Sequence, residues 1–468
     1  MKRIYPHIAI IAMFLAPFLT RAQTKLPTFF ADHMVLQQQE EAAIWGWDDA
    51  NQSITVEGSW GQKATTQADQ TGKWQVHLPT PAAGGPYTLT ISGNDKITLQ
   101  NVMIGEVWIC SGQSNMAMTL KGYSNQPIYG AGDAILDAVQ SDIRMYTASR
   151  VPSVEPLTDL EGTWKVSNTE NAPGFSAAAY FFGRLLEQTL DVPVGLIITS
   201  WGGSKVEAWM DESSLRNSGI EEFPTEIPER APHQAPTLLY NGMIKPLIPF
   251  TAKGFLWYQG ESNVGNADQY RKLFTDMITL WRNDFQNTEM PFYFVEIAPY
   301  NYGGRNSAYL REAQLKTMLT LPHTGMAGTM DIGNCTNIHP GNKKDVGRRL
   351  ALWALSQTYG LNGFQYSGPI YQSMEKTDDH KIILSFDHAE NGLSTFGQPL
   401  KGFEIAGDDG NFMPAQASIG GKSTVTVWSD QVSNPQVVRY GFSNCPETTL
   451  YNMQKLPAPS FRTDMDVE

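Results

Sequence analysis

Four short polar motifs contain the residue types that acyl transfer requires. The first places Ser114 in a Gly-Gln-Ser-Asn run, directly after an apolar stretch that is typical of a buried strand. A serine at such a junction exposes its hydroxyl at the edge of a sheet, and its own amide can face a developing oxyanion. The same position also suits a helix N-cap, so this motif alone leaves both interpretations open.

Two further motifs could supply donors to an oxyanion. Gly202 and Gly203 follow another apolar stretch and let the backbone approach a ligand closely. Asn263 ends a polar run in which Gln259 and Glu261 could orient neighbours or bind hydroxyl groups. Paired glycines usually form turns and polar runs are common in loops, so each signal is weak alone.

His339 is the candidate general base. It lies in an Asn-Ile-His-Pro-Gly run before a predicted long helix, and a partly exposed imidazole can accept a proton near neutral pH. A loop histidine without a role fits the same pattern. However, serine, glycine pair, asparagine and histidine each follow a different predicted strand, and together they predict serine-dependent acyl transfer.

The elements that must position these motifs alternate between strands and helices. Apolar stretches predict strands at 106–110, 194–199, 254–258, 292–297 and 325–330. Amphipathic stretches predict helices at 176–190, 268–285, 307–319 and 342–359. This alternation predicts a parallel sheet with helices on both faces, whose active site lies at the carboxyl ends of the strands.

The flanking regions have a different pattern. Residues 23–103 contain short alternating runs separated by turn clusters, which predict a small β-sandwich. Residues 360–468 are also β-rich. We therefore expect three domains in the 468-residue chain: an N-terminal β-sandwich at 23–103, a catalytic domain at 104–359 and a C-terminal β-rich domain at 360–468.

Residues 1–22 predict the compartment. Two basic residues precede an apolar core that ends at a small-residue site, as in a secretory signal peptide, so we expect a periplasmic or extracellular protein. No later segment offers about 20 uninterrupted apolar residues, so no membrane anchor is expected. The net charge of −13 disfavours binding to nucleic acid.

The three cysteines, Cys110, Cys335 and Cys445, are odd in number and widely spaced. This pattern predicts neither a disulfide framework nor a zinc site. We therefore expect buried free thiols, with Cys110 and Cys335 as neighbours of the two main motifs.

Taken together, the motifs resemble the sialate O-acetylesterase family of the SGNH-hydrolase superfamily. The resemblance rests on the residues 112–115, 201–203, 257–263 and 338–340, and it extends over roughly residues 25–360. It implies an SGNH-hydrolase-like α/β fold with small all-β domains on its flanks.

The resemblance also implies the roles of the residues. Ser114 would attack the ester carbonyl, and His339 would take its proton and return it to the leaving sugar hydroxyl. The oxyanion would be held by the amide of Ser114, the amide of Gly203 or Gly202, and the side chain of Asn263. The family needs no metal and no cofactor.

One departure from the family pattern concerns the acid that orients the histidine. Thr336 and Asn337 stand where relatives carry an aspartate before the catalytic histidine. Asp331 and Glu261 are the candidates to replace it, while a backbone carbonyl or a Ser-His dyad without a third member remain alternatives.

The resemblance implies a sugar O-acetyl ester, with sialic acid first and acetylated xylan or pectin as the alternative. A sialic acid requires a cation for its carboxylate, for which Lys205, Arg305 and Arg311 are candidates. Gln113, Gln259 and Glu261 are the other expected substrate contacts. A non-catalytic carbohydrate-binding protein is a further alternative, but it would be expected to lack Ser114 or His339, and both are present.

Overall fold

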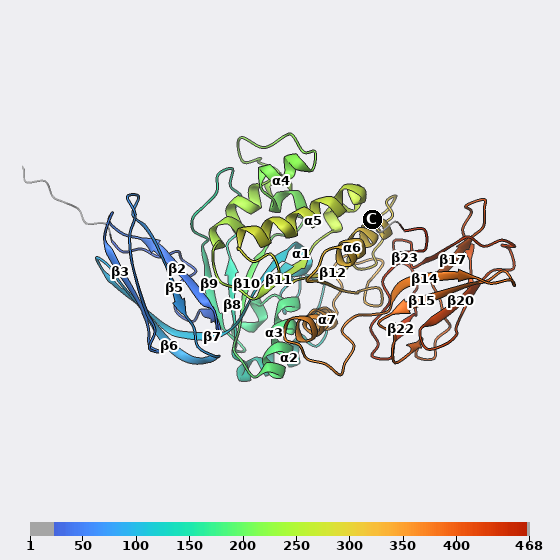
Figure 1. Cartoon of the computed structure of the whole chain (residues 1–468), viewed down its shortest axis with the longest axis horizontal. Helices are drawn as coiled ribbons and strands as arrows, with labels where there is room; N and C mark the ends of the chain where they lie inside the picture. Colours follow the sequence, from blue (N-terminus) through green and yellow to red (C-terminus); the bar gives the residue numbers. More distant parts are fainter. Residues whose placement is uncertain (1–22, 466–468) are drawn as a thin grey trace, which may run out of the picture.

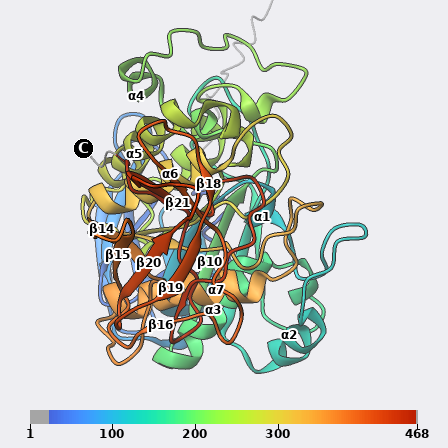
Figure 2. The ribbon, with the colours of Figure 1, turned by 90° about the vertical axis from the view of Figure 1, so that its right-hand side faces the viewer.

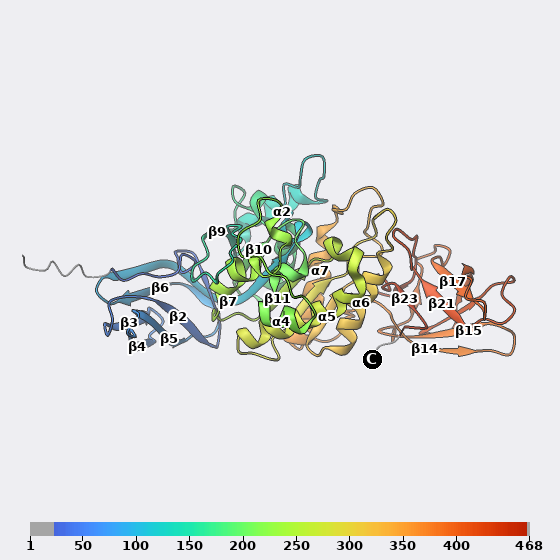
Figure 3. The ribbon, with the colours of Figure 1, turned by 90° about the horizontal axis from the view of Figure 1, so that it is seen from above.

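The computed structural model describes residues 23–465, so the predicted signal peptide at 1–22 lies outside the described residues. Three parts of the chain lie side by side along the long axis of the molecule (Figures 1 and 3). An N-terminal group of strands is followed by a central part with helices on a sheet, and then by a C-terminal group of strands.

The central sheet has the order β13-β12-β11-β7-β10-β8-β9. All of its neighbouring strands are parallel except β8 and β9, which are antiparallel. The predicted strands are present, and β8 and β9 are additional. The strands are β7 (Lys96–Gly112), β8 (Ile143–Ala148), β9 (Gly162–Val166), β10 (Val194–Ser200), β11 (Gly254–Tyr258), β12 (Phe292–Val295) and β13 (Thr324–Ala327).

Helices cover both faces of this sheet because its strands alternate apolar side chains to each side. On β11, Phe255 and Trp257 pack in the cluster that includes α5 (Ala267–Asp284) and α6 (Ala308–Thr320). Leu256 and Tyr258 pack in the second cluster with α3 (Ala177–Leu190) and α7 (Lys343–Trp353). The fold class expected from the sequence is confirmed.

Two of the helices begin at side-chain caps that the sequence contains. The Ser176 hydroxyl accepts from the Ala179 amide at the start of α3, and Asn342 accepts from the Asp345 amide at the start of α7. Helix α7 continues as a π-helical turn, Ala354–Thr358, so the predicted 342–359 helix is one helix with an irregular end.

The N-terminal strands form two sheets, one of which shares strand β7 with the central part. One sheet pairs β2 with β5, and the other contains β1, β3, β4, β6 and the first half of β7. The second half of β7 pairs with β10 and β11, so the predicted boundary at 103/104 lies inside one continuous strand. The additional strands are β1 (Val35–Gln37), β2 (Glu41–Trp47), β3 (Ser53–Gly58), β4 (Lys63–Gln67), β5 (Lys73–Pro79) and β6 (Gly84–Ser92).

The C-terminal strands form antiparallel sheets that face the viewer in Figure 2. Two four-stranded sheets have the orders β14-β15-β20-β19 and β18-β17-β21-β23, and β16 pairs with β22. Their strands are β14 (Ile370–Lys376), β15 (Ile382–Asp387), β16 (Leu393–Ser394), β17 (Phe403–Ala406), β18 (Met413–Pro414), β19 (Gln416–Ile419), β20 (Thr424–Trp428), β21 (Val437–Tyr440), β22 (Tyr451–Asn452) and β23 (Phe461–Arg462).

Side chains fasten this C-terminal part to the central part. Cys335 and Cys445 form a disulfide, so the expectation of free thiols is wrong for these two residues and holds only for buried Cys110. Arg311 of α6 is 0% exposed and donates to the Ser460 hydroxyl and to the Gly441 carbonyl. The sequence could not reveal the disulfide because 110 residues separate its cysteines.

Candidate active site

The turn after β7 places Ser114 at the carboxyl edge of the central sheet. Gly112, at the end of the strand, has φ +133°, and a Cβ there would lie 2.2 Å from the Tyr258 carbonyl oxygen. Only glycine therefore fits this crossing. The short helix α1 (Ser114–Ala117) begins at Ser114, whose side chain is half-exposed.

The Ser114 hydroxyl meets the imidazole of His339. Ser114 Oγ and His339 Nε2 are 2.8 Å apart, although 225 residues separate them in the sequence. The loop after β13 carries His339, and the side chain of Asn337 accepts from the His339 amide at 2.9 Å. The geometry thus brings the predicted nucleophile and base into hydrogen-bonding contact.

The other imidazole nitrogen contacts an amide rather than a carboxylate. His339 Nδ1 lies 2.8 Å from Gln126 Oε1. Because an amide oxygen only accepts, Nδ1 carries the proton and Nε2 is free to accept from Ser114. Sequence reasoning missed Gln126, since a single glutamine in a polar loop carries no signal of such a role.

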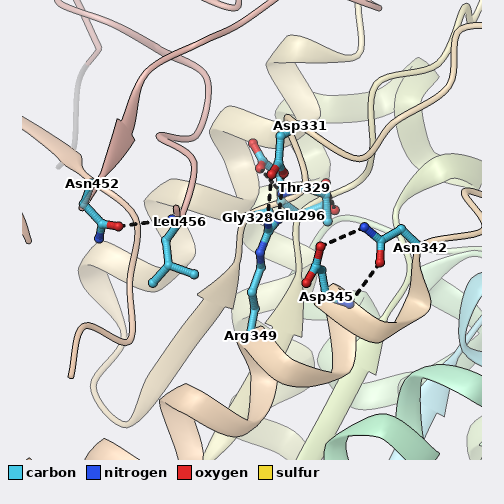
Figure 4. A network of polar contacts seen from close by, with 9 residues as sticks. All are labelled: Glu296, Gly328, Thr329, Asp331, Asn342, Asp345, Arg349, Asn452 and Leu456. Atoms are coloured by element: carbon cyan, nitrogen blue, oxygen red, sulfur yellow. Dashed lines mark hydrogen bonds and ion pairs between the residues drawn. The ribbon is translucent and has the colours of Figure 1, made fainter. Parts of the chain in front are cut away.

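Neither predicted orienting acid contacts His339, so this expectation is wrong. Asp331 forms a bidentate ion pair with Arg349 of α7, with both oxygens at 2.7 Å, beside buried Glu296 (Figure 4). Glu261 Oε1 instead accepts from Asn115 Nδ2 at 2.5 Å. Asp331 is thus engaged by a guanidinium, whereas buried Glu261 has a neutral amide at Oε1 and no hydrogen-bond partner at Oε2 among the described residues.

A buried lysine lies behind the serine and histidine loops. Lys343 is 0% exposed, and its ammonium donates to Asn115 Oδ1 at 2.6 Å and to the Pro340 carbonyl at 2.8 Å. Asn115 Nδ2 also donates to the Ile338 carbonyl at 3.1 Å. Lys343 and Asn115 therefore connect the loop of the nucleophile to the loop of the base.

Burial decides the charge states in this network. It lowers the pKa of His339 to about 4, and the nearby Lys343 ammonium acts in the same direction. It also lowers the pKa of Lys343 to about 7, against the attraction of Glu261, whose own pKa burial raises. His339 is therefore neutral at neutral pH, as a general base must be.

Of the predicted oxyanion donors, the glycine backbone lies beside Ser114. A Cβ built at Gly202 would lie 3.3 Å from the Ser114 Cβ, so this backbone passes directly beside the nucleophile. Gly203 follows with φ +78°. Asn263 is 2% exposed, and its Oδ1 accepts from the Val206 amide and from Gln259.

The side-chain amide of Asn263 donates one hydrogen bond among the described residues. Its Nδ2 donates to Glu207 Oε2 at 2.9 Å. A primary amide has two N–H groups, so the second is available once the fixed Oδ1 has set the orientation of the side chain.

The predicted substrate contacts are mostly structural. Gln259 is 0% exposed and donates to Asn263 Oδ1 at 2.7 Å and to the Ser204 carbonyl at 3.1 Å. The Gln113 side chain accepts from the Gly260 amide at 3.4 Å, and buried Glu261 holds Asn115. These three expectations are therefore corrected, because the residues position loops from within the protein.

Of the three predicted cations, Arg311 is corrected, and Lys205 and Arg305 remain predictions. Arg311 is fully buried against the C-terminal part, and the Arg305 guanidinium packs directly on Gly265. Lys205 precedes the short helix η3 (Val206–Trp209). Among the described residues, none of the three makes a hydrogen bond or ion pair with Ser114 or His339.

Three residues that the sequence did not indicate lie around the site. Tyr123 donates to the Ser114 carbonyl at 2.9 Å and packs edge-on to the His339 ring. His233 stacks on Trp201, and its Nε2 would lie 3.1 Å from a Cβ at Gly203. The exposed Arg150 donates from Nε to the Ser200 carbonyl at 3.3 Å.

Several known proteins are similar to this chain in sequence, and one solved structure is also similar in fold. The sialate O-acetylesterases of rat and human are 28% and 29% identical over 93% of this chain, and they are covered over 94% and 92% of their own lengths. The crystal structure of a carbohydrate acetylesterase from Xanthomonas citri is 40% identical, with a TM-score of 0.87. The alignment covers 95% of this chain and 100% of that one.

The family model described as "Carbohydrate esterase, sialic acid-specific acetylesterase" matches residues 104–356. This range contains every residue of the Ser114 and His339 site described above. The resemblance noted in the sequence is thus confirmed, and the chain belongs to this family of carboxylic ester hydrolases that remove O-acetyl groups from sugars.

Proposed function

We propose that this esterase removes O-acetyl groups from sialic acids through an acetyl-enzyme on Ser114, after export from the cytoplasm. The observation that carries the mechanism is the 2.8 Å contact between Ser114 Oγ and His339 Nε2, made by a histidine that burial keeps neutral. A nucleophile beside a neutral base is the arrangement that ester cleavage requires.

In the first half of the reaction, Ser114 Oγ attacks the acetyl carbonyl while His339 Nε2 takes the hydroxyl proton. The resulting oxyanion accepts hydrogen bonds from the Ser114 amide, the Gly202 or Gly203 amide and the second N–H of Asn263. His339 then gives its proton to the departing sugar oxygen, and the acetyl group remains on Ser114.

In the second half, water attacks the acetyl-enzyme with His339 as base, and acetate leaves. Gln126 accepts from Nδ1 throughout and so stabilises the imidazolium that forms transiently. A neutral amide accepts a weaker hydrogen bond than a carboxylate, so in this proposal the base relies on orientation more than on an adjacent charge.

Arg150 supports an acidic sugar as the substrate. Its charge acts on residues of both sides of the site, because it opposes the burial-driven rise in the pKa of Tyr123 and helps burial to lower the pKa of His233. Among the described residues, its terminal guanidinium nitrogens make no hydrogen bond or ion pair, and only Nε is engaged. A planar guanidinium in this state suits the carboxylate of a sialic acid.

The decisive experiment compares acetate release from 9-O-acetylated sialosides, acetylated xylan and acetylated pectin. We expect the highest kcat/KM on the sialosides, and Arg150→Gln should raise their KM about tenfold because it removes one charge-assisted contact. Arg216→Gln is the matched control, since Arg216 is an exposed arginine of α4 (Glu212–Asn217) that pairs with Glu212. Preference for xylan or pectin, with no effect of Arg150→Gln, would reject the sialic acid assignment.

The export part of the proposal has separate support. The Cys335–Cys445 disulfide suits an oxidising compartment. Among residues 23–465, no helix has the length and apolarity needed to cross a bilayer. N-terminal sequencing of the protein from the producing cell tests this part; we expect a mature chain that begins near Gln23, and a chain that retains Met1 in the cytoplasm would contradict it.

A further inference from the structure

A cleft of about 490 Å³ lies between the N-terminal strands and the central part of the molecule. Three tryptophans from β2 and β5 line one side of it, and the segments 156–158 and 245–249 line the other. The tryptophans are Trp45, Trp47 and Trp74. None of the Ser114 or His339 site residues contributes to it.

The alternation of β2 explains why indole rings gather here. Ala42, Ile44 and Gly46 are buried in the sandwich, so Trp45 and Trp47 project from the opposite face and are only half-buried. Their partners across the strand pair β2–β5 are Gln75 and Lys73. Aromatic faces therefore alternate with an exposed amide and an exposed ammonium group.

The third tryptophan, Trp74, lies mostly inside the sandwich. Trp74 is 3% exposed and packs against Gly46, and its Nε1–H has no hydrogen-bond partner among the described residues. Buried indole N–H groups usually find an acceptor. The Trp74 donor therefore belongs to the buried face of the strand pair, and the cleft itself combines flat apolar faces with polar side-chain ends.

We propose that this cleft is a non-catalytic binding site for the glycan chain that carries the acetyl ester. A pyranose ring presents C–H groups on its faces and hydroxyl groups around its rim. The faces can stack on Trp45 and Trp47, while the rim can hydrogen-bond with Gln75 and Lys73. A mainly apolar cleft with a few placed polar groups is the usual form of such a site. The identity of the ligand depends on the proposed function, whereas the presence of the cleft does not.

The chain connects this cleft to the active site by a short path. Arg150 contacts the Ser200 carbonyl at the site, and Pro156 lines the cleft six residues later. Six residues span at most about 20 Å when fully extended. The Leu157 amide donates to the Asn241 carbonyl at 2.9 Å, which fixes the cleft end of this segment. One oligosaccharide could therefore contact both sites.

Direct binding tests the proposal without catalysis. The Ser114→Ala protein is titrated calorimetrically with non-acetylated sialyllactose and, separately, with xylohexaose. We expect one of them to bind, and adding Trp47→Ala should weaken that binding at least about tenfold, as for a central aromatic contact. Trp60→Ala is the matched control, because Trp60 is a half-buried tryptophan in the turn between β3 and β4 that lies outside the cleft and donates to the Pro79 carbonyl.

A second variant covers the case in which Trp47→Ala does not fold. Gln75→Ala changes an exposed side chain opposite Trp45 and should weaken binding about threefold, the loss of one neutral hydrogen bond. Binding that is absent for both glycans, or equal in the Trp47→Ala and Trp60→Ala proteins, would overturn the proposal.

Kinetics separate this proposal from the proposed function. In the active enzyme, Trp47→Ala should raise KM for an acetylated oligosaccharide and leave kcat/KM for p-nitrophenyl acetate unchanged. If sugar acetates are not cleaved but Trp47-dependent binding persists, the function fails and the cleft stands. If they are cleaved with an unaltered KM in Trp47→Ala, the cleft fails and the function stands.

Discussion

The two groups of β-strands are attached to the central part in different ways. The N-terminal group shares the backbone of β7, which leaves its sheet, enters the central sheet and ends two residues before Ser114. Side chains crosslink the C-terminal group to the central part, among them the Cys335–Cys445 disulfide, the contacts of Arg311 and the Arg462–Glu312 ion pair. The backbone connection through β7 leads to the nucleophile Ser114. The side-chain connection at Cys335 holds the loop that carries the base His339.

This difference predicts different sensitivities. A strand inside two sheets is fixed by hydrogen bonds along its length, so Ser114 can move only if the core moves. The loop of His339 lies outside the sheet, and its position depends on Cys335, on Asn337 and on Lys343. We therefore expect the position of the base to be more easily perturbed than that of the nucleophile.

Of the variants considered, Ser114→Ala should have the largest effect on kcat. It should lower kcat on an activated acetyl ester by at least about 10³-fold, because no acetyl-enzyme can form, and the melting temperature should stay nearly unchanged. Steady-state hydrolysis and thermal unfolding measure the two quantities. Residual activity of more than a few per cent would remove Ser114 from its assigned role.

Asn263→Ala tests a residue held within the central part. We expect kcat to fall roughly 10²–10³-fold if the amide donates to the oxyanion, with a smaller change in KM. Ser262→Ala, at the half-exposed neighbouring position, is the control and should retain activity. An unchanged kcat in Asn263→Ala would show that the oxyanion is stabilised by the backbone alone.

Gln126 variants test how the base is oriented. Gln126→Ala should lower kcat about 5- to 10-fold, the equivalent of one hydrogen bond worth about 1 kcal/mol. In the unchanged enzyme His339 has a pKa of about 4, so kcat/KM should fall only as the pH drops toward that value and the imidazole becomes protonated. Gln126→Glu places a negative charge at Nδ1 and should move this acid limb to higher pH. A limb that does not move would place another group in control of the profile.

The double variant Cys335→Ser, Cys445→Ser directly tests the side-chain connection. It should lower the free energy of unfolding by about 2–4 kcal/mol and lower kcat a few-fold, because the loop four residues before His339 loses its crosslink. Chemical denaturation and steady-state kinetics on the same samples measure both effects. A loss of stability with wild-type kcat would mean that the crosslink does not help to position the base.

Much of the fold follows from the sequence because its signals are local. Apolar runs predicted β11 at its observed bounds, and amphipathic runs predicted the starts of α3 and α7 to within about one residue. Strand β8 carries a buried arginine, Arg144, that bonds to the Asn101 side chain, so no apolar run indicated it.

The site residues that could be predicted from the sequence are likewise those that follow the end of a strand. Ser114, Gly202, Asn263 and His339 each follow a strand, and parallel strands bring such positions to one edge. Gln126 lies in a loop whose path depends on tertiary packing, and no spacing rule connects it to His339. Asp331 was a reasonable candidate by position, but the ion pair with Arg349 could be known only from the packing of α7.

The position of Cys445 also has a consequence for the order in which the protein matures. A ribosome must complete a further 110 residues after Cys335 before the partner cysteine exists. The serine end of the site can therefore form on an unfinished chain, whereas the histidine end is crosslinked only after nearly the whole polypeptide has been made and oxidised.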